Sequence, residues 1–430
     1  MKKGLMLALL LAGCAARIPT EGTEIGNGRW FNGTGFVPGT WYVVNGTLTR
    51  HRPGRIVATI DLKGEYAVPA YGEAHNHNIS RPPRPAELQR YIKQGVLYMM
   101  NLNNVIEGPD GDRSAQPVDV LYANGGLTGG GGHVVELHEQ IIDRGGMKGI
   151  RKEDLDGYAF HVIESTEELQ AKWPRILAAK PDVIKVYLGF SEEHERRKSS
   201  PEHFGKRGLN PALLPEIVRM AHRDRLRVAV HIETARDFEV AVEAGADIIA
   251  HLPGWRVGET AGSDLEIGRW LISETAAREA AARGVMVETA ALASETLRSG
   301  KPEEAALIRE IHRRNLETLR KAGVHLVLGS DLYNGTSLAE ALFLGAGDNL
   351  PGFESLAVMD NLEVLRLLAE TTPQAIFPGR KIGKLAEGYE ATFLTLSQDP
   401  LADLKALSSI TRRFKRGVEL ADTALPGRTG

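Results

Sequence analysis

The sequence predicts an α/β protein with a TIM-like (β/α)8 barrel and a small β-sandwich domain formed from both chain ends. In the middle of the chain, short apolar runs alternate with segments of helical pattern, as they do in parallel α/β barrels. Polar residues follow several of these runs, at the strand ends where such barrels carry their chemistry. The two ends of the chain instead contain short β-like segments separated by turn signals.

Eight barrel strands are expected, each from one short apolar run. Their approximate ranges are 67–75, 96–103, 118–123, 182–188, 227–232, 247–252, 284–289 and 324–330. A capping box at Ser165–Glu168 and the helical spacing of apolar residues over 210–224 indicate helices between them. Gly284 and Gly323 are expected at helix C-termini, because glycine readily adopts the left-handed conformation found there. The barrel is assigned to 67–380.

The β-sandwich domain is assigned to 26–66 and 381–430. The first segment is rich in Gly, Thr, Val and Trp and has turn signals at Asn32-Gly33, Asn45-Gly46 and Pro53-Gly54. A similar texture returns near the C-terminus in "EATFLTLS" and "ITRRFKRGVEL". Short antiparallel strands from the two ends are therefore expected to pack together.

The N-terminus has the pattern of a bacterial lipoprotein signal. Lys2 and Lys3 precede an apolar run that is too short to span a bilayer but suits a signal peptide. The run ends in a sequence that resembles a lipobox, Leu11-Ala12-Gly13-Cys14. We expect a signal peptide over 1–13, lipidation of Cys14 and a tether over 14–25; an ordinary secretory signal with a chance cysteine is the alternative. Either predicts an extracytoplasmic protein, and lipidation would anchor it to a bacterial membrane, in the periplasm or at the outer membrane.

Composition and charge narrow the class of partner. Hydrophobic residues make up 42% and charged residues 25% of the 430 residues, as in ordinary globular proteins. The net charge is −3 and no basic patch stands out, so nucleic acid is not an expected partner. Cys14 is the only cysteine, so the fold does not rely on disulfides. A homo-oligomer is compatible with the sequence.

Six residues at or near the predicted strand ends form a candidate two-metal site. They are His75, His77, Lys185, His231, His251 and Asp331. The two-residue spacing of the first pair directs both imidazoles to one face of a strand. The next two histidines are separated by about one βα unit, which allows them to lie on adjacent strands. A carboxylate at the last strand end can bind a metal ion and accept a proton from water.

Lys185 is surrounded by β-branched residues, in Val183-Ile184-Lys185-Val186-Tyr187. An unpaired ammonium group is costly to bury, so this lysine needs a partner, a shifted pKa or a modification. Carbamylation by CO2 would convert it into an anion able to bridge two cations. A lysine that faces outward or snorkels to solvent is the alternative.

Two further residues are candidates for binding the substrate. His133 ends the glycine-rich loop 125–133, which lacks the Gly-Lys-Ser/Thr ending of a phosphate-binding loop. Tyr187 should share the strand face of Lys185 and can hydrogen-bond a substrate; a packed barrel tyrosine is the alternative. The charged segment 191–208 is either a flap that sets substrate choice or a solvated loop. Six other histidines are expected at the surface: His138, His161, His194, His203, His222 and His312.

Together these motifs resemble the amidohydrolase superfamily, specifically its imidazolonepropionase-like and metal-dependent prolidase branch. The resemblance runs from about residue 28 to 422. It rests on His75-Asn76-His77, Ile184-Lys185-Val186-Tyr187, Val230-His231, "EAGADIIAHLP" and Gly329-Ser330-Asp331. It departs at Pro69–Glu73, where the family usually reads "PGLID", and at Ala391-Thr392, where the family has Ala-Asp. Neither departure changes a predicted ligand.

The resemblance implies the ligands of two divalent metal ions. His75, His77 and Asp331 would hold the first ion. His231 and His251 would hold the second. Zinc is the default metal, because the ligands are histidines, a carboxylate and a carbamate.

The resemblance also implies the chemistry. Carboxylated Lys185 would bridge both ions together with a hydroxide, which makes CO2 a second cofactor. Asp331 would pass a proton to the leaving nitrogen, and His133 would polarise the substrate carbonyl. We therefore expect hydrolysis of a C–N bond in a small amide: a dipeptide, an N-acyl amino acid or a cyclic amide. A deaminase, a lactonase or phosphotriesterase on the same scaffold, and a non-catalytic surface-binding lipoprotein, stay open.

Overall fold

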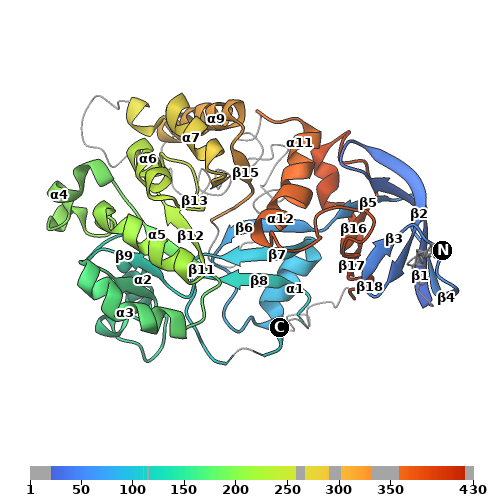
Figure 1. The fold of residues 1–430 in the computed structure, drawn as a ribbon, viewed down its shortest axis with the longest axis horizontal. Helices are drawn as coiled ribbons and strands as arrows, with labels where there is room; N and C mark the ends of the chain where they lie inside the picture. Colours follow the sequence, from blue (N-terminus) through green and yellow to red (C-terminus); the bar gives the residue numbers. More distant parts are fainter. Residues whose placement is uncertain are drawn as a thin grey trace, which may run out of the picture.

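A ring of parallel strands occupies the middle of the chain, and a separate sheet carries both chain ends (Figure 1). The computed structural model describes residues 21–109, 111–113, 116–257, 267–289, 302–331 and 358–421. Cys14 and the expected signal peptide lie outside these residues. Within them, no helix combines the length and the apolar character needed to cross a bilayer.

The strands of the ring belong to two parallel sheets, with orders β6-β7-β8 and β10-β9-β11-β12-β13-β14-β15. Their bounds are β6 (Tyr71–Asn76), β7 (Val96–Asn101), β8 (Asp119–Tyr122), β9 (Gly126–Thr128), β10 (Phe160–Val162), β11 (Val183–Tyr187), β12 (Arg227–His231), β13 (Ile248–Ala250), β14 (Met286–Glu288) and β15 (His325–Val327). All except β9 and β10 correspond to a predicted barrel strand, so the predicted fold class is confirmed.

Two seams complete the ring where the strand ladder is interrupted. At one seam, β8 is followed in the chain by β9, which pairs with β11. A hydrogen bond joins β8 to the start of β11, because the Asp182 amide donates to the Tyr122 carbonyl at 2.8 Å. At the other, the Ala74 amide of β6 donates to the Leu328 carbonyl just after β15 at 2.7 Å. The pairing of β6 with β7 also shifts register twice, so this strand is irregular where it reaches the candidate site.

Helices cover the outside of the ring (Figure 1). The main ones are α1 (Pro85–Lys93), α2 (Val135–Asp143), α3 (Thr166–Ala178), α5 (Leu214–Arg223), α6 (Ala235–Ala244), α7 (Glu274–Ala282), α9 (Pro302–Ala322), α11 (Asn361–Arg366) and α12 (Thr372–Ile376). The predicted capping box is half formed: the Ser165 hydroxyl accepts from the Glu168 amide at 3.1 Å, but Glu168 accepts from the Glu164 amide instead. Gly284 and Gly323 have left-handed φ values of +69° and +78°, as predicted for helix C-termini.

The two chain ends share one eight-stranded sheet, ordered β18-β17-β16-β5-β1-β2-β3 with β4 paired to β1. The bounds are β1 (Glu21–Phe31), β2 (Phe36–Val44), β3 (Thr47–Thr49), β4 (Arg55–Asp61), β5 (Tyr66–Pro69), β16 (Phe393–Leu396), β17 (Ile410–Lys415) and β18 (Val418–Glu419). Aromatic rings pack across the junction: Phe393 lies 5.3 Å from Trp30 and 4.5 Å from Phe414, measured between ring centroids. This packing fixes the C-terminal strands against the N-terminal ones.

Two expected boundaries are wrong. The single strand expected over 67–75 is two strands: β5 pairs with β1 and β16 in the terminal sheet, whereas β6 pairs with β7 in the barrel. A run of apolar residues cannot show that a chain changes sheets at Ala70. The expected tether over 14–25 ends earlier than predicted, because β1 begins at Glu21 and pairs with β4 from its first residue.

Three of the histidines expected at the surface are buried. His138 and His161 are each 5% exposed, and His312 is 0% exposed. His138 Nδ1 lies 2.8 Å from the Val134 carbonyl, and the His312 ring packs edge-on against Trp255 at 4.7 Å. Position in a helical or irregular segment does not show which face a residue occupies, and the prediction failed for that reason. The prediction was better for the others: His222 is exposed, and His194 and His203 are half-buried.

Candidate metal centre

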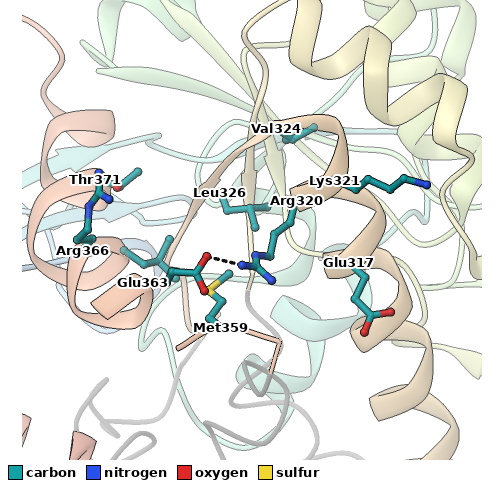
Figure 2. Close-up of a pocket in the computed structure, with 10 residues that line it drawn as sticks. Glu317, Arg320, Lys321, Val324, Leu326, Met359, Glu363, Arg366 and Thr371 are labelled. Atoms are coloured by element: carbon teal, nitrogen blue, oxygen red, sulfur yellow. Dashed lines mark hydrogen bonds and ion pairs between the residues drawn. The ribbon is translucent and has the colours of Figure 1, made fainter. Parts of the chain in front are cut away.

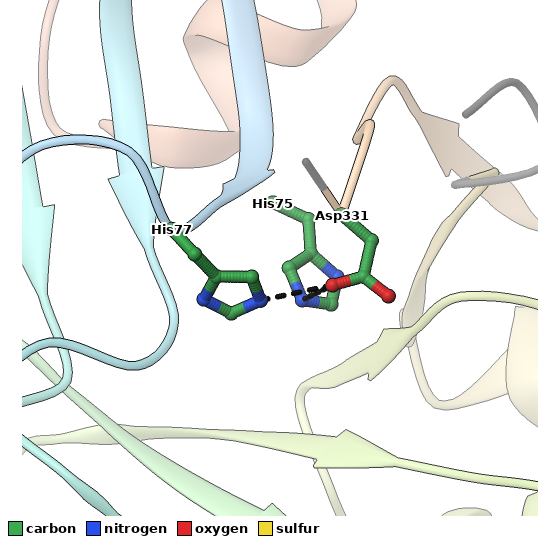
Figure 3. A group of neighbouring side chains, drawn as sticks. All are labelled: His75, His77 and Asp331. Atoms are coloured by element: carbon green, nitrogen blue, oxygen red, sulfur yellow. Dashed lines mark hydrogen bonds and ion pairs between the residues drawn. The ribbon is translucent and has the colours of Figure 1, made fainter. Parts of the chain in front are cut away.

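The first ligand group comprises His75, His77 and Asp331, which converge from β6 and from the turn after β15 (Figure 3). Asp331 Oδ1 lies 2.9 Å from His77 Nε2 and 3.3 Å from His75 Nε2. The three possible ligand atoms all lie within 4.8 Å of one another. Two imidazole nitrogens and one carboxylate oxygen therefore face a common point, as a metal ion of the zinc type requires.

Backbone hydrogen bonds place Asp331 against His75. The amides of Ser330 and Asp331 both donate to the His75 carbonyl, at 3.1 and 2.9 Å. Asp331 adopts a left-handed φ of +54°, a conformation that is unfavourable for aspartate relative to glycine. The Ser330 hydroxyl also donates to the buried Glu73 carboxylate. The seam between β15 and β6 thus holds a strained ligand in place.

The second ligand group comprises His231 and His251, on adjacent strands. His231 ends β12 and His251 follows β13, with a left-handed φ of +86°. His231 Nδ1 and His251 Nε2 face each other at 2.7 Å. The opposite nitrogens are engaged elsewhere: His231 Nε2 lies 3.0 Å from Glu233 Oε1, and His251 Nδ1 lies 3.0 Å from the Leu252 carbonyl. The Trp255 indole also donates to His251 Nδ1 at 2.7 Å.

Lys185 is buried inside the ring and adjoins both groups. It lies in β11 and is 1% exposed, so it does not face outward or snorkel to solvent. Among the residues that the structure describes, its Nζ has no hydrogen-bond partner. Burial lowers the pKa of Lys185 to about 8, opposed by the charges of Glu288 and Asp331. Part of the population is then neutral near pH 8, as reaction of the amine with CO2 requires.

His75, His231, His251 and Asp331 have pKa values that suit metal ligands. Burial holds the pKa of His75 and of His231 well below the usual value and lowers that of His251 to about 4. Burial acts in the opposite sense on Asp331, but the neighbouring His75 and His77 hold the pKa of this carboxyl well below its usual range. Neutral imidazoles and an ionised carboxylate can bind a cation without first losing protons.

His133 and Tyr187, the two residues predicted to bind the substrate, lie beside the second ligand group. The His133 ring stacks on that of His231 with centroids 4.3 Å apart and lies 5.3 Å from the Tyr187 ring. Burial raises the pKa of Tyr187, so its hydroxyl stays protonated and can donate a hydrogen bond. Gly126 makes room for this ring, because a Cβ there would lie only 2.3 Å from Tyr187.

The charged segment 191–208 packs against the loop that carries His133. The His133 amide donates to the Arg207 carbonyl at 2.5 Å, and the Gly205 amide donates to the Gly131 carbonyl at 2.9 Å. The Arg256 guanidinium lies 3.2 Å from both His133 Nδ1 and the Gly205 carbonyl. The segment therefore adjoins the candidate site, and its role as a flap stays a prediction.

Three charged residues of the site were missed in the sequence. Glu288 Oε2 lies 2.8 Å from His75 Nδ1, and Glu233 Oε1 accepts from Arg256 Nε at 2.9 Å. His133, His231 and Glu233 also form a group whose possible ligand atoms lie within 4.8 Å. A signal existed for Glu288, because it ends the seventh predicted strand and so occupies the position equivalent to the assigned ligands.

A separate pocket of about 550 Å³ lies between α9 and α11 (Figure 2). The ion pair between Arg320 and Glu363 crosses it. Its lining contains none of the predicted ligands. The metal centre is therefore distinct from this pocket.

Comparison with known proteins identifies a family model that fits most of the chain. The model of the amidohydrolase family matches residues 140–420, a range that contains Lys185, His231, His251 and Asp331 and begins after His75 and His77. Ochratoxinase from Aspergillus niger is 25% identical over 215 residues. That match covers 49% of this chain and 41% of ochratoxinase, so it spans less than half the length of this relative.

Solved structures with the same fold include several hydrolases. A prolidase complexed with N-methylphosphonate-L-proline superposes with a TM-score of 0.68 at 18% identity, covering 93% of this chain and 99% of the prolidase. Molinate hydrolase superposes with a TM-score of 0.67 at 17% identity, covering 95% of this chain and 96% of the hydrolase. A. niger ochratoxinase superposes with a TM-score of 0.66 at 17% identity, covering 93% of this chain and 96% of ochratoxinase. At these identities the likeness shows the fold alone.

Proposed function

Because the chain belongs to the amidohydrolase family, we propose that it is a metal-dependent hydrolase that cleaves a C–N bond of a small substrate at a two-metal centre. The observation that carries the proposal is the convergence of two ligand groups around one buried lysine. The rings of His75 and His251, one from each group, stack with centroids 6.2 Å apart. Lys185 lies in the same ring of strands without a hydrogen-bond partner among the described residues.

The residues present fit two divalent cations. His75, His77 and Asp331 would hold one, and His231 and His251 the other, with carboxylated Lys185 between them. Neutral imidazoles, an ionised carboxylate and a carbamate suit zinc. Two such cations supply the Lewis acidity that polarises a carbonyl and makes water nucleophilic at neutral pH.

Carboxylation would give Lys185 the charge that its position demands. The neutral Nζ would attack the carbon of CO2, so that an N–C bond forms while one C=O π bond breaks and its electron pair moves to oxygen. Nζ would then lose one proton to solvent. The product is a carbamate anion. This anion removes the cost of a buried unpaired ammonium group and supplies two oxygen ligands.

The remaining residues would handle the proton and the substrate. Asp331 would accept a proton from the attacking water at its carboxylate and pass it to the leaving nitrogen. His133 would donate a hydrogen bond to the substrate carbonyl oxygen, where negative charge develops. The neutral Tyr187 hydroxyl would donate to a second acceptor on the substrate.

We propose a small amide as substrate: a dipeptide, an N-acyl amino acid or a cyclic amide. The likeness to a prolidase and to ochratoxinase supports this class, although the shared fold does not fix the substrate. The lipid anchor on Cys14 and the extracytoplasmic location also remain proposals, resting on the sequence of residues 1–14. A Cys14→Ala variant should leave the membrane fraction when cells are fractionated.

The first experiment is to measure metal content by mass spectrometry, on protein expressed with zinc and bicarbonate, beside a Lys185→Ala variant. We expect two ions per chain in the parent and a sharp fall in the variant. With ¹³C-labelled bicarbonate, a carbamate NMR signal should be present only in the parent. One ion or fewer, unchanged by the substitution, would remove the bridging role of Lys185.

A substrate panel then separates the remaining functions. Hydrolysis of dipeptides or N-acyl amino acids supports the proposed activity. Release of ammonia would identify a deaminase, and turnover of lactones or phosphotriesters would identify the other scaffold relatives. Tight metal retention with no turnover on any member would favour a binding protein.

A further inference from the structure

We propose that two buried glutamates, Glu288 and Glu233, each position one histidine of a different ligand group, so that each glutamate controls the affinity of a different metal ion. Neither residue belongs to the predicted ligand set. The inference rests on the proposed two-metal function. It goes beyond that function by assigning a role to two acidic side chains that the mechanism does not use.

Glu288 approaches His75 from the side opposite the first ligand group. It ends β14, is fully buried, and places Oε2 2.8 Å from His75 Nδ1. The other ring nitrogen, Nε2, faces Asp331 at 3.3 Å. Among the described residues, neither oxygen of Glu288 has an aligned hydrogen bond, and its 2.8 Å approach to His75 Nδ1 is an ion-pair contact.

The backbone leaves space for this contact. A Cβ on Gly329 would lie 2.7 Å from His75 Cβ and 3.4 Å from Glu288 Cβ. Glycine at this position therefore leaves room for His75 beside the turn that carries Asp331. The Glu288 and Asp331 carboxylates face opposite nitrogens of the His75 ring, at 2.8 and 3.3 Å.

Glu233 holds His231 in the same way but through the other ring nitrogen. Glu233 Oε1 lies 3.0 Å from His231 Nε2, which leaves Nδ1 facing His251 at 2.7 Å. The glutamate is itself fixed: its amide donates to the Asp237 carboxylate at 2.9 Å, and Arg256 Nε donates to its Oε1 at 2.9 Å. It therefore presents a rigid acceptor to the imidazole.

A carboxylate that accepts a hydrogen bond from one imidazole nitrogen fixes the tautomer and makes the other nitrogen a better ligand. By this rule Glu233, which is hydrogen-bonded to His231 Nε2, selects Nδ1 of His231. Glu288 lies 2.8 Å from His75 Nδ1 without an aligned hydrogen bond, and it would select Nε2 of His75 once the two groups align. Glu233 also lies close enough to His133 and His231 to be a ligand itself. Its Oε1 already accepts from the Arg256 guanidinium, and this favours the positioning role.

The test measures zinc affinity of the full chain by chelator competition in two backgrounds. His77→Ala weakens the first group and leaves the second intact; His251→Ala does the reverse. Among the described residues, the glutamates form their close contacts with His75 and His231, and not with the background residues His77 and His251. In the His77→Ala background, we expect Glu233→Gln to weaken the remaining tight ion about 10-fold and Glu288→Gln to leave it unchanged. In the His251→Ala background, we expect Glu288→Gln to weaken the remaining tight ion about 10-fold and Glu233→Gln to leave it unchanged.

Glu370→Gln is the matched control, because Glu370 is a buried glutamate paired with Arg366, outside the site. It should change neither affinity. Thermal unfolding of the metal-free variants checks that they fold. Should a glutamine variant fail to fold, Glu288→Asp or Glu233→Asp, which keeps the charge but draws the carboxylate back, takes its place with the same expected selectivity.

Each outcome decides the proposal. Equal weakening of both ions by both glutamate variants, or no weakening, would overturn the positioning roles while the two-metal function stands. A loss at one ion well beyond about 100-fold would make that glutamate a ligand, and would also overturn its positioning role. If the parent holds fewer than two ions, the proposed function fails first and the inference fails with it.

Discussion

The first ligand group contains a carboxylate, whereas the second contains only neutral imidazoles. His75, His77 and Asp331 already present a negative charge to a cation, and backbone hydrogen bonds from Ser330 and Asp331 to His75 hold them together. The pair assigned to the second ion, His231 and His251, includes no anion, because Glu233 is proposed to position His231 and not to bind the ion. Under the proposed function the second group would depend on a charge from elsewhere, which carboxylated Lys185 would supply.

The largest effect should come from Asp331, because under the proposed function it would serve both as a ligand of the first ion and as the proton carrier. Asp331→Asn keeps the shape of the side chain but removes its charge and basicity. We expect kcat on the best panel substrate to fall by about 10²- to 10⁴-fold, and the first ion to bind more weakly. Full turnover in the zinc-loaded variant would contradict both roles.

Lys185→Ala tests the second group. Without the carbamate, the affinity for the second ion should fall by more than about 100-fold, beyond the range of residues that act through another ligand. The first ion should be weakened less, because Asp331 remains. Chelator competition measures both affinities, and Lys415→Ala, which removes another buried lysine in the terminal sheet, should keep both ions. Equal loss of the two ions would remove the proposed asymmetry.

His133 should affect the substrate and neither metal group. Removing a donor aimed at developing charge lowers kcat by about 10²- to 10³-fold, and we expect a loss of that order in His133→Gln. Zinc content should stay at two ions per chain. The exposed His222→Gln serves as control in both assays. A loss of the second ion in His133→Gln would instead make His133 a ligand.

Gly329→Ala should damage the first group selectively. The added Cβ would lie 2.7 Å from His75 Cβ and 3.2 Å from the His75 amide nitrogen, so the backbone must shift. We expect a loss of about 1–3 kcal/mol in the free energy of unfolding, together with weaker binding of the first ion. Gly268→Ala is the matched control, because no atom of the described residues lies within 4 Å of the new Cβ. Chemical denaturation and chelator competition provide the two measurements.

The last effect, which is small at neutral pH and grows only in acid, concerns a buried histidine outside both groups. Burial lowers the pKa of His161 to about 4, below its ordinary value near 6.5 in the unfolded chain. The unfolded state therefore binds the proton first as pH falls, and stability is lost between about pH 6.5 and 4. Between about pH 6.5 and 4, the free energy of unfolding should fall by up to about 3 kcal/mol less in His161→Gln than in the parent. At pH 7 the two proteins should differ little in this free energy. Identical pH profiles from denaturation experiments would contradict this assignment.

The buried histidines show where sequence reasoning stopped. A strand followed by a helix fixes which residue reaches a strand end, so His75, His231 and His251 could be placed together from local patterns. His138, His161 and His312 are equally neutral and buried, but their burial depends on which helix face or loop side packs inward. The short segments that carry these three histidines show no clear hydrophobic period, so the inward-facing side could not be predicted from the sequence.

The sequence by itself predicted eight of the parallel strands and placed the six candidate ligands at or near their ends, because both follow from short-range periodicity. It also indicated the family, through motifs that resemble it. Only the tertiary structure decided the partners of those ligands. Glu288 meets His75, and the turn at Gly329 admits both, through contacts between segments far apart in the chain. It also decided that the chain changes sheets at Ala70, since pairing of β5 with β16 joins the two ends. Such contacts are set by the packing of the whole fold, and local sequence patterns do not predict them.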